Sequence, residues 1–323
     1  MPVITYREAL RQAISEEMRQ DEKVWILGQN IAGYGGTYAV TKGLIDEFGP
    51  ERVRDAPIME SGILGLAAGS AMSGGTRPIA EIMSINFTLV GIDQIINHAA
   101  KLHYMFGGQW SCPMVIRTAS GYGQLSATHS QTFEMFYAYV PGLKVVMPAT
   151  PYDAKGLLKA AIRDNDPVMF IEHSNLYGQK GEVPDGDYVV PIGKADVKRE
   201  GTDVTLVAYS SMLKPALTAA EKLAEAGISA EVVDLRSLRP LDTDTVVASV
   251  KKTNRMVMVE EGHRSYGIGA EVCARVQEEA FDWLDAPIQR VGGKEVPMPY
   301  AKNLEKLCIP TDADVVAAVR SIL

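Results

Sequence analysis

The chain has 323 residues, of which 46% are hydrophobic and 22% are charged, and its formal net charge at pH 7 is -8. That length predicts two domains of ordinary size, each able to bury a sizeable core. The 32 basic residues are scattered, which argues against a surface that binds nucleic acid or an anionic membrane. No stretch reaches the roughly 18 consecutive apolar residues that would predict a membrane span.

The first expected element is a helix. Thr5 and Glu8 form a capping-box pattern that predicts a helix ending near Gln20. Short apolar runs then alternate with longer helical patterns, which is typical of βαβ units in a largely parallel sheet. We expect strands at 24–28, 52–57, 78–83, 113–119, 143–149 and 168–173, and helices near 37–48, 60–74, 87–106 and 151–164.

A polar stretch at 178–187 breaks this rhythm and is the best candidate for an interdomain linker. The alternation then resumes, with expected strands at 203–209, 229–234, 255–261 and 288–291, and helices from Pro215 to Gly227, near 243–252 and near 268–281. We therefore predict an α/β protein with two α/β domains, residues 1–180 and 195–323.

Glu60 stands out because it is a lone carboxylate at the start of a run of small and apolar residues that lasts to about Gly75. Such a run packs closely, and a partly desolvated carboxyl group can exchange a proton near neutral pH. The alternative is that Glu60 caps the first turn of a helix and contacts solvent. The segment itself leaves both interpretations open.

The five histidines differ in their promise as site residues. His129 follows a predicted strand and the loop at 120–126, at the sheet edge where open α/β proteins bind ligands. His98 and His103 lie on the expected helix 87–106 and are interpreted as surface or interface residues. His173 and His263 each follow a strand, and we rank both below His129.

Several familiar motifs are missing from the sequence. No Walker loop occurs, and no Gly-Asp-Gly followed some distance on by Asn offers a magnesium-diphosphate site. Residues 267–270 resemble half a dinucleotide fingerprint, which we interpret as tight helix packing. Cys112, Cys273 and Cys308 lie far apart without CxxC spacing, so we expect reduced thiols in an unsecreted, cytoplasmic protein.

Taken together, the quoted segments resemble the β subunit of the thiamine-diphosphate-dependent 2-oxoacid dehydrogenase first component, of the pyruvate or acetoin type, in the transketolase-like family. The resemblance extends along essentially the whole chain. Its matching stretches, in order, are 54–65, 93–95, 99–101, 104–109 (YMFGGQ), 129–131 (HSQ), 141–146, 153–158 and 234–236 (DLR).

The resemblance implies a pyrimidine-binding domain followed by a transketolase C-terminal-like domain. It implies that an α subunit binds Mg2+ and the diphosphate of thiamine diphosphate, while this chain binds the aminopyrimidine ring. Glu60 would then be the catalytic glutamate at the pyrimidine nitrogen, and Phe87 the aromatic residue stacked on that ring. His129 would stabilise the substrate or intermediate and assist acyl transfer to lipoamide.

The resemblance also implies a structural potassium ion. Backbone carbonyls of the turn at 161–166 would bind it, and the matching positions are Ala161, Ile162, Asp164 and Asp166.

The sequence departs from the family pattern at two places, and the first of them concerns proton transfer. Gln29 and Asn30 stand where many relatives have Glu-Asp, and Thr128 stands where they have Gln. An amide cannot carry a net proton as a carboxyl group can, so communication between two active sites would be altered here.

The sequence therefore predicts the β subunit of a pyruvate dehydrogenase-type heterotetramer, which decarboxylates a 2-oxoacid and passes the acyl group to a dihydrolipoyl acyltransferase. Stretch 104–109 favours the pyruvate or acetoin branch. The alternatives are the β subunit of an acetoin dehydrogenase and a catalytically silent scaffolding subunit.

Overall fold

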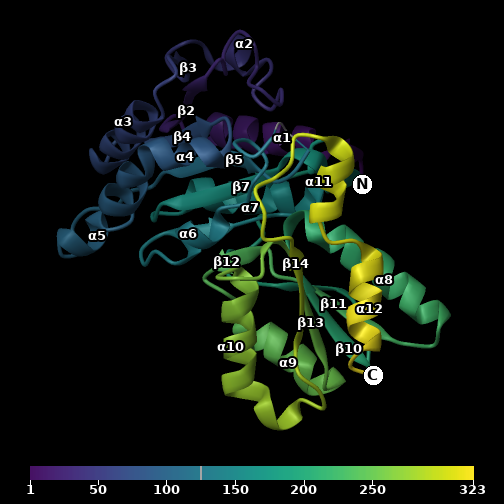
Figure 1. Ribbon diagram of the computed structural model, residues 1–323. Coiled ribbons are helices and arrows are strands. Elements are labelled where there is room, and N and C mark those ends of the chain that lie inside the picture. Colours follow the sequence, from purple (N-terminus) through teal and green to yellow (C-terminus); the bar gives the residue numbers. More distant parts are fainter. Residues whose placement is uncertain (124–125) are drawn as a thin grey trace. The chain divides into compact units, whose positions relative to one another are not determined.

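The computed structural model describes residues 1–123 and 126–323, and these form two compact units (Figure 1). The first unit comprises Met1–Ser120 and Phe136–Ile192, and the second comprises Gly121–Met135 and Gly193–Leu323. The polar stretch 178–187 thus lies within the first unit. It contains strand β8 (Lys180–Glu182), which pairs antiparallel with β1 (Val3–Thr5).

A parallel sheet forms the centre of the first unit. Its strands run in the order β6-β7-β5-β4-β2-β3, and each neighbouring pair is parallel. This confirms the sheet type expected from the alternating pattern. The strand bounds are β2 (Val24–Gln29), β3 (Val53–Ala56), β4 (Arg77–Ile82), β5 (Val115–Ser120), β6 (Lys144–Val146) and β7 (Val168–His173).

The main core of the first unit lies between its strands and two helices, α1 and α7. The predicted capping box opens α1: the Glu8 amide donates to Thr5 Oγ1 at 3.2 Å, and the Thr5 amide donates to the Glu8 carboxylate at 2.8 Å. The helices are α1 (Tyr6–Gln20), α2 (Leu44–Phe48), α3 (Glu60–Met72), α4 (Ile85–Thr88), α5 (Leu102–Met105) and α7 (Pro151–Arg163). Helix α6 (Glu134–Ala138) starts in the chain segment assigned to the second unit and ends in that of the first.

The prediction of a single helix at 87–106 is wrong. The chain there forms α4, a 3-10 turn η1 (Leu89–Gly91), a π-helical turn η2 (Gln94–Ala99) and α5. Close packing against α3 explains the change, because a Cβ on Gly91 would lie 2.5 Å from Leu64 Cδ1 and 3.2 Å from the Glu60 carbonyl oxygen. The helix expected near 37–48 is confined to α2, which starts after Gly43 in the left-handed region, with φ +84.

The second unit contains a five-stranded sheet in the order β14-β13-β10-β11-β9. Only β9, which sequence analysis did not predict, runs antiparallel to its neighbour. The strands are β9 (Asp196–Arg199), β10 (Val204–Ala208), β11 (Ala230–Asp234), β13 (Met256–His263) and β14 (Gln289–Gly293), and a further short strand is β12 (Ser237–Arg239).

Helices cover both faces of this sheet, with α8 and α12 on one face and α9 and α10 on the other (Figure 1). The helices are α8 (Leu213–Glu225), α9 (Thr243–Thr253), α10 (Ile268–Ala280), α11 (Lys302–Cys308) and α12 (Asp312–Arg320), and short 3-10 turns are η4 (Ser210–Met212) and η5 (Phe281–Trp283). A further 3-10 turn, η3 (Ser174–Leu176), belongs to the first unit. Within the described residues, no helix is both long enough and apolar enough to cross a membrane.

The two glycines at the start of α10 serve helix packing, as predicted. The Gly269 amide donates to Glu260 Oε2 at 3.0 Å, and a Cβ on Gly267 would lie 2.6 Å from that same oxygen. Arg290 donates to the other carboxylate oxygen at 2.9 Å. A buried side chain of this chain therefore occupies the helix N-terminus where a dinucleotide-binding fold would hold phosphate.

A buried cation joins three central strands of the first unit. Arg117 on β5 is 2% exposed and donates to the carboxylates of Glu81 on β4 and Glu172 on β7. Tyr177 donates to Glu172 Oε2 at 2.6 Å. Burial lowers the pKa of Arg117, but Glu172 and Glu81 outweigh it and raise that pKa above its ordinary range.

Replacing Arg117 by Leu would leave two carboxylates buried without their cation. We predict a loss of about 3–5 kcal/mol in the free energy of unfolding, measured by chemical denaturation of the purified chain. The control is Arg19→Leu, which removes an exposed pair with Glu47 and should cost less than about 1 kcal/mol. Equal small losses in both variants would contradict a stabilising role for the buried network.

Candidate active site

The carboxyl ends of three neighbouring strands carry residues singled out from the sequence. Gln29 ends β2, Glu60 begins α3 soon after β3, and Phe87 lies in α4 just after β4. Because these strands are parallel and adjacent in the order β4-β2-β3, the three residues lie at one edge of the sheet. Ligands bind at that edge in open α/β sheets.

Glu60 is the first residue of α3 and is half-buried. Its carboxyl group makes no hydrogen bond or ion pair with any residue in 1–123 or 126–323. The preceding residue, Met59, gives the helix no side-chain cap. A carboxylate in the first turn of a helix is favoured by the helix dipole. Glu60 therefore has the helix-start position of the alternative interpretation, and its carboxylate oxygens have no partner among the described residues.

Large apolar side chains lie exposed on the elements next to Glu60. They occur in the approach to α3, on α3 itself and in η1, which packs on α3. The residues and their exposed fractions are Ile58 (73%), Met59 (55%), Leu66 (57%) and Val90 (64%). Exposed apolar side chains grouped in this way are typical of a surface that another protein covers.

Phe87 is half-buried on α4, a helix of one turn that the core holds in place. Thr88, the next residue, donates to the Ile85 carbonyl at 2.5 Å, and its hydroxyl also contacts the Tyr137 hydroxyl. A fixed aromatic ring beside an edge that binds ligands offers an apolar face on which a planar ring can stack.

The loop that follows β2 is tied to the end of β3. The Ala32 amide donates to Asp55 Oδ1 at 2.8 Å, and Thr41 Oγ1 donates to the Ile31 carbonyl at 2.7 Å. Asn30 has φ 54, a left-handed conformation that asparagine tolerates. Gln29 and Asn30 therefore lie at the same edge as Glu60, and their effect on proton transfer stays a prediction.

His129 belongs to the segment Gly121–Met135, which is part of the second unit. Its ring Nδ1 lies 2.9 Å from Thr128 Oγ1, and its amide donates to the Ser126 carbonyl at 3.4 Å. Thr128 thus contacts the imidazole. Two residues of the preceding loop, Gln124 and Leu125, lie outside the described residues.

Three of the other four histidines have local partners. His173 is 1% exposed and accepts the Asn175 amide at its Nδ1 at 3.2 Å. His98 lies 3.2 Å from Asp93 on the surface, and His103 Nδ1 lies 2.8 Å from the Trp110 carbonyl oxygen. His263 ends β13.

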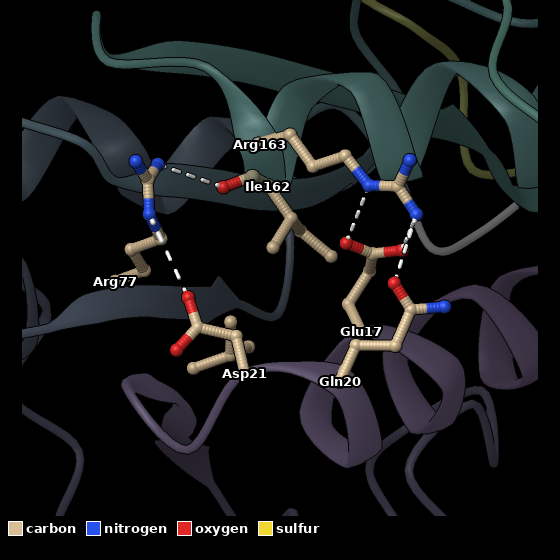
Figure 2. Close-up of a pocket in the computed structure, with 7 residues that line it drawn as sticks. Glu17, Gln20, Asp21, Arg77, Ile162 and Arg163 are labelled. Atoms are coloured by element: carbon tan, nitrogen blue, oxygen red, sulfur yellow. Dashed lines mark hydrogen bonds and ion pairs between the residues drawn. The ribbon is translucent and has the colours of Figure 1, made fainter.

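The turn predicted to bind potassium contacts an arginine (Figure 2). Arg77 Nη1 donates to the carbonyl oxygens of Ile162 at 3.2 Å and Asp164 at 2.8 Å. The Ala161 carbonyl accepts the Asp164 amide, and Lys144 lies 3.0 Å from Asp166 Oδ2. An open cavity beside Arg77 is lined by Glu17, Gln20, Asp21, Val24, Arg77, Ile162 and Arg163.

These contacts fit an alkali cation poorly while Arg77 holds this position. The guanidinium already places a positive charge at two of the four predicted ligands, and it would repel a second cation. Sequence analysis did not single out Arg77, whose only signal is a basic residue at the start of a strand. Among the described residues, no group of three or more His, Cys, Asp or Glu side chains could hold a metal ion.

Two family models match the chain. The transketolase pyrimidine binding domain matches residues 3–180, and the transketolase C-terminal domain matches residues 193–315.

Curated relatives match along nearly the whole chain. The pyruvate dehydrogenase E1 component subunit beta of Rhizobium meliloti is 53% identical over 100% of this chain and 70% of that protein. The subunit of the same name from Rickettsia felis is 51% identical over 99% of this chain and 98% of that protein. The mitochondrial subunit beta-1 of Arabidopsis thaliana is 52% identical over 98% of this chain and 88% of that protein.

A solved structure is also similar. It is described as a split gene transketolase, inactive beta4 tetramer. Its TM-score is 0.82 at 27% identity, covering 99% of this chain and 98% of that one.

The Arg77 contacts generate a test of the potassium prediction. In Arg77→Met the carbonyls of Ile162 and Asp164 lose their guanidinium, so we expect potassium chloride, relative to lithium chloride, to raise the midpoint of thermal unfolding more than in wild type. Each kcal/mol of ion binding would shift the midpoint by about 2–4 °C. Arg77→Lys, which keeps the charge, is the control. If potassium shifts the unfolding midpoint of wild type as much as that of Arg77→Met, the ion and the arginine do not compete for these carbonyl oxygens.

Proposed function

The chain belongs to the transketolase-like family, with the β subunits of the pyruvate dehydrogenase E1 component as relatives, and we propose that it is such a β subunit. The activity is thiamine-dependent oxidative decarboxylation of a 2-oxoacid, pyruvate, with acyl transfer to lipoamide. The observation that carries the proposal is the unpaired Glu60 carboxyl at the ligand-binding edge of the pyrimidine-binding domain.

Glu60 and Phe87 would hold the pyrimidine end of thiamine diphosphate. The unpaired carboxyl group suits a hydrogen bond to a ring nitrogen, and the ring of Phe87 suits stacking on a planar heterocycle. When bound, the cofactor supplies the nucleophilic carbon that the protein side chains lack. Glu60 would hold or accept one proton at the ring nitrogen.

The α subunit is the partner that this half-site requires. The sequence has no recognisable phosphate-binding motif, and the exposed Ile58, Met59, Leu66 and Val90 near Glu60 form an apolar surface suited to a second chain. One similar structure is described as an inactive beta4 tetramer, which is the behaviour expected of such subunits alone. We propose an active heterotetramer in which the α subunit binds Mg2+ and the diphosphate.

The remaining parts of the proposal concern the acyl acceptor and the setting. A dihydrolipoyl acyltransferase would take the acyl group from the complex. Potassium at the turn 161–166 stays a prediction, with Arg77 as the competing cation. A cytoplasmic location also stays a prediction, and some of the relatives are described as mitochondrial.

The decisive variant is Glu60→Gln, which keeps the shape but cannot exchange a net proton. Co-purified with its α subunit, it should lose at least about 100-fold in pyruvate turnover while the complex assembles normally. Glu22→Gln, an exposed carboxylate at the opposite, amino edge of the sheet, is the matched control. Unchanged turnover in Glu60→Gln, or robust turnover by the wild-type chain without an α subunit, would contradict the proposal.

His129 is tested by separating cofactor binding from acyl transfer. We predict that His129→Ala lowers acyl transfer to lipoamide by about 100-fold and leaves thiamine diphosphate affinity near that of wild type. The control is His98→Ala, which removes an exposed histidine paired with Asp93. Wild-type rates of acyl transfer in His129→Ala would remove His129 from the site.

A further inference from the structure

Two buried glutamates join the segment Gly121–Met135, which carries His129, to other parts of the second unit. Glu134 belongs to the segment, and Glu261 lies on β13. Glu261, at 8% exposure, accepts the Tyr122 amide at 2.9 Å and the Ser211 hydroxyl at 2.7 Å. Glu134, at 2% exposure, accepts the Tyr209 hydroxyl at 2.8 Å. One contact thus lies near the start of the segment Gly121–Met135 and the other near its end, with His129 between them.

Close backbone packing accompanies these hydrogen bonds. A Cβ on Gly262 would lie 3.3 Å from Thr132 Oγ1 and 3.6 Å from Glu134 Oε1. The Gly121 amide donates to the Gln131 carbonyl at 3.3 Å, which draws the two ends of the segment together. The end of β13 therefore lies directly against the segment.

The second carboxyl oxygen of Glu134 indicates that this group is protonated. Oε2 is buried and has no hydrogen-bond partner among the described residues, although an ionised carboxylate oxygen without a partner is costly to bury. Burial raises the pKa of Glu134 to about 7, the charges of Glu261 and Glu260 add to this, and the bond from Tyr209 opposes it.

The titratable groups that face Glu134 come from two elements. Tyr209 follows β10, and Glu260 and Glu261 belong to β13. Of these, Glu260 is paired with Arg290 at 2.9 Å. The two charges with the largest effect on the pKa of Glu134, those of Glu261 and Glu260, are both negative and favour its protonated form.

We infer that Glu134 and Glu261 are positioning residues that tie the segment Gly121–Met135 to the rest of the second unit, and that Glu134 does so in its protonated form. The anchoring stands on the contacts above. Its effect on catalysis rests on the proposed role of His129 in acyl transfer.

The inference fixes the sign of the pH dependence. The pKa of Glu134 is near 7 in the folded chain and about 4.5 ordinarily, so the folded form holds the proton more tightly. The contribution of this group to stability is fully present below the ordinary pKa and is lost as the pH rises through about 7. Above that pH the ionised carboxylate faces Glu261 and Glu260, and the segment loosens.

The test is hydrogen exchange of the segment 126–135 in the complex with the α subunit, corrected for intrinsic rates, at pH 6 and pH 8. In wild type we expect exchange to rise up to about tenfold between these pH values, because the ionised fraction of a group with a pKa of about 7 rises about tenfold from pH 6 to pH 8. Glu134→Gln should remove that rise, and Glu134→Ala should exchange faster at both pH values. Tyr209→Phe, which deletes only the hydroxyl, should also exchange faster.

Glu231→Gln is the matched control, since it alters a buried carboxylate of the same unit that pairs with Lys252. It should leave exchange of the segment as in wild type. A wild-type rate that does not change with pH, or wild-type exchange in both Glu134→Ala and Tyr209→Phe, would overturn the inference.

Acyl transfer to lipoamide separates this inference from the proposed function. The rate in wild type should fall over the same pH range, and Glu134→Gln should keep it. If exchange changes as expected while acyl transfer does not, the anchoring stands and the role proposed for His129 fails.

Discussion

The carboxyl edge of the first sheet depends on the buried Arg117 and its two glutamates. They join β4, β5 and β7, and the network reaches the site through Glu81. A Cβ on Gly36, which has φ +77, would lie 2.9 Å from Glu81 Oε1, so the loop after β2 packs directly on that carboxylate. The buried ion pairs of Arg117 and the position of the loop after β2 therefore depend on the same carboxylate, that of Glu81.

The regular elements could be predicted because their signals are local. The capping box at Thr5 and Glu8, the parallel strands and the helix α7 all follow from residues close together in the sequence. The expected helix at 87–106 failed because its path is set by contact between Gly91 and α3, which no local pattern contains. The roles of Glu60, Phe87 and His129 were implied by family resemblance rather than by periodicity.

The turn at 161–166 shows how a sequence pattern can leave its cation unspecified. Carbonyl oxygens attract positive charge whichever group supplies it, and carbonyl ligands leave little trace in the side chains. Arg77 is far from the turn in sequence, yet it donates to both Ile162 and Asp164. Three-dimensional contacts were needed to reveal this arginine, because its position opening β4 gives no hint of the turn.

Glu60 and Glu134 show two ways in which a carboxyl oxygen without a hydrogen-bond partner can be placed. Glu60 is half-buried at an open edge next to exposed apolar side chains, so a ligand and a second chain can complete its surroundings. Glu134 is 2% exposed, and its second oxygen has no hydrogen-bond partner among the described residues. An enclosed acid that has no cation as a partner can relieve the cost of burial by keeping a proton, whereas an acid at an open edge can exchange one with a bound molecule. Exposure thus distinguishes the carboxyl group suited to catalysis from the one suited to positioning.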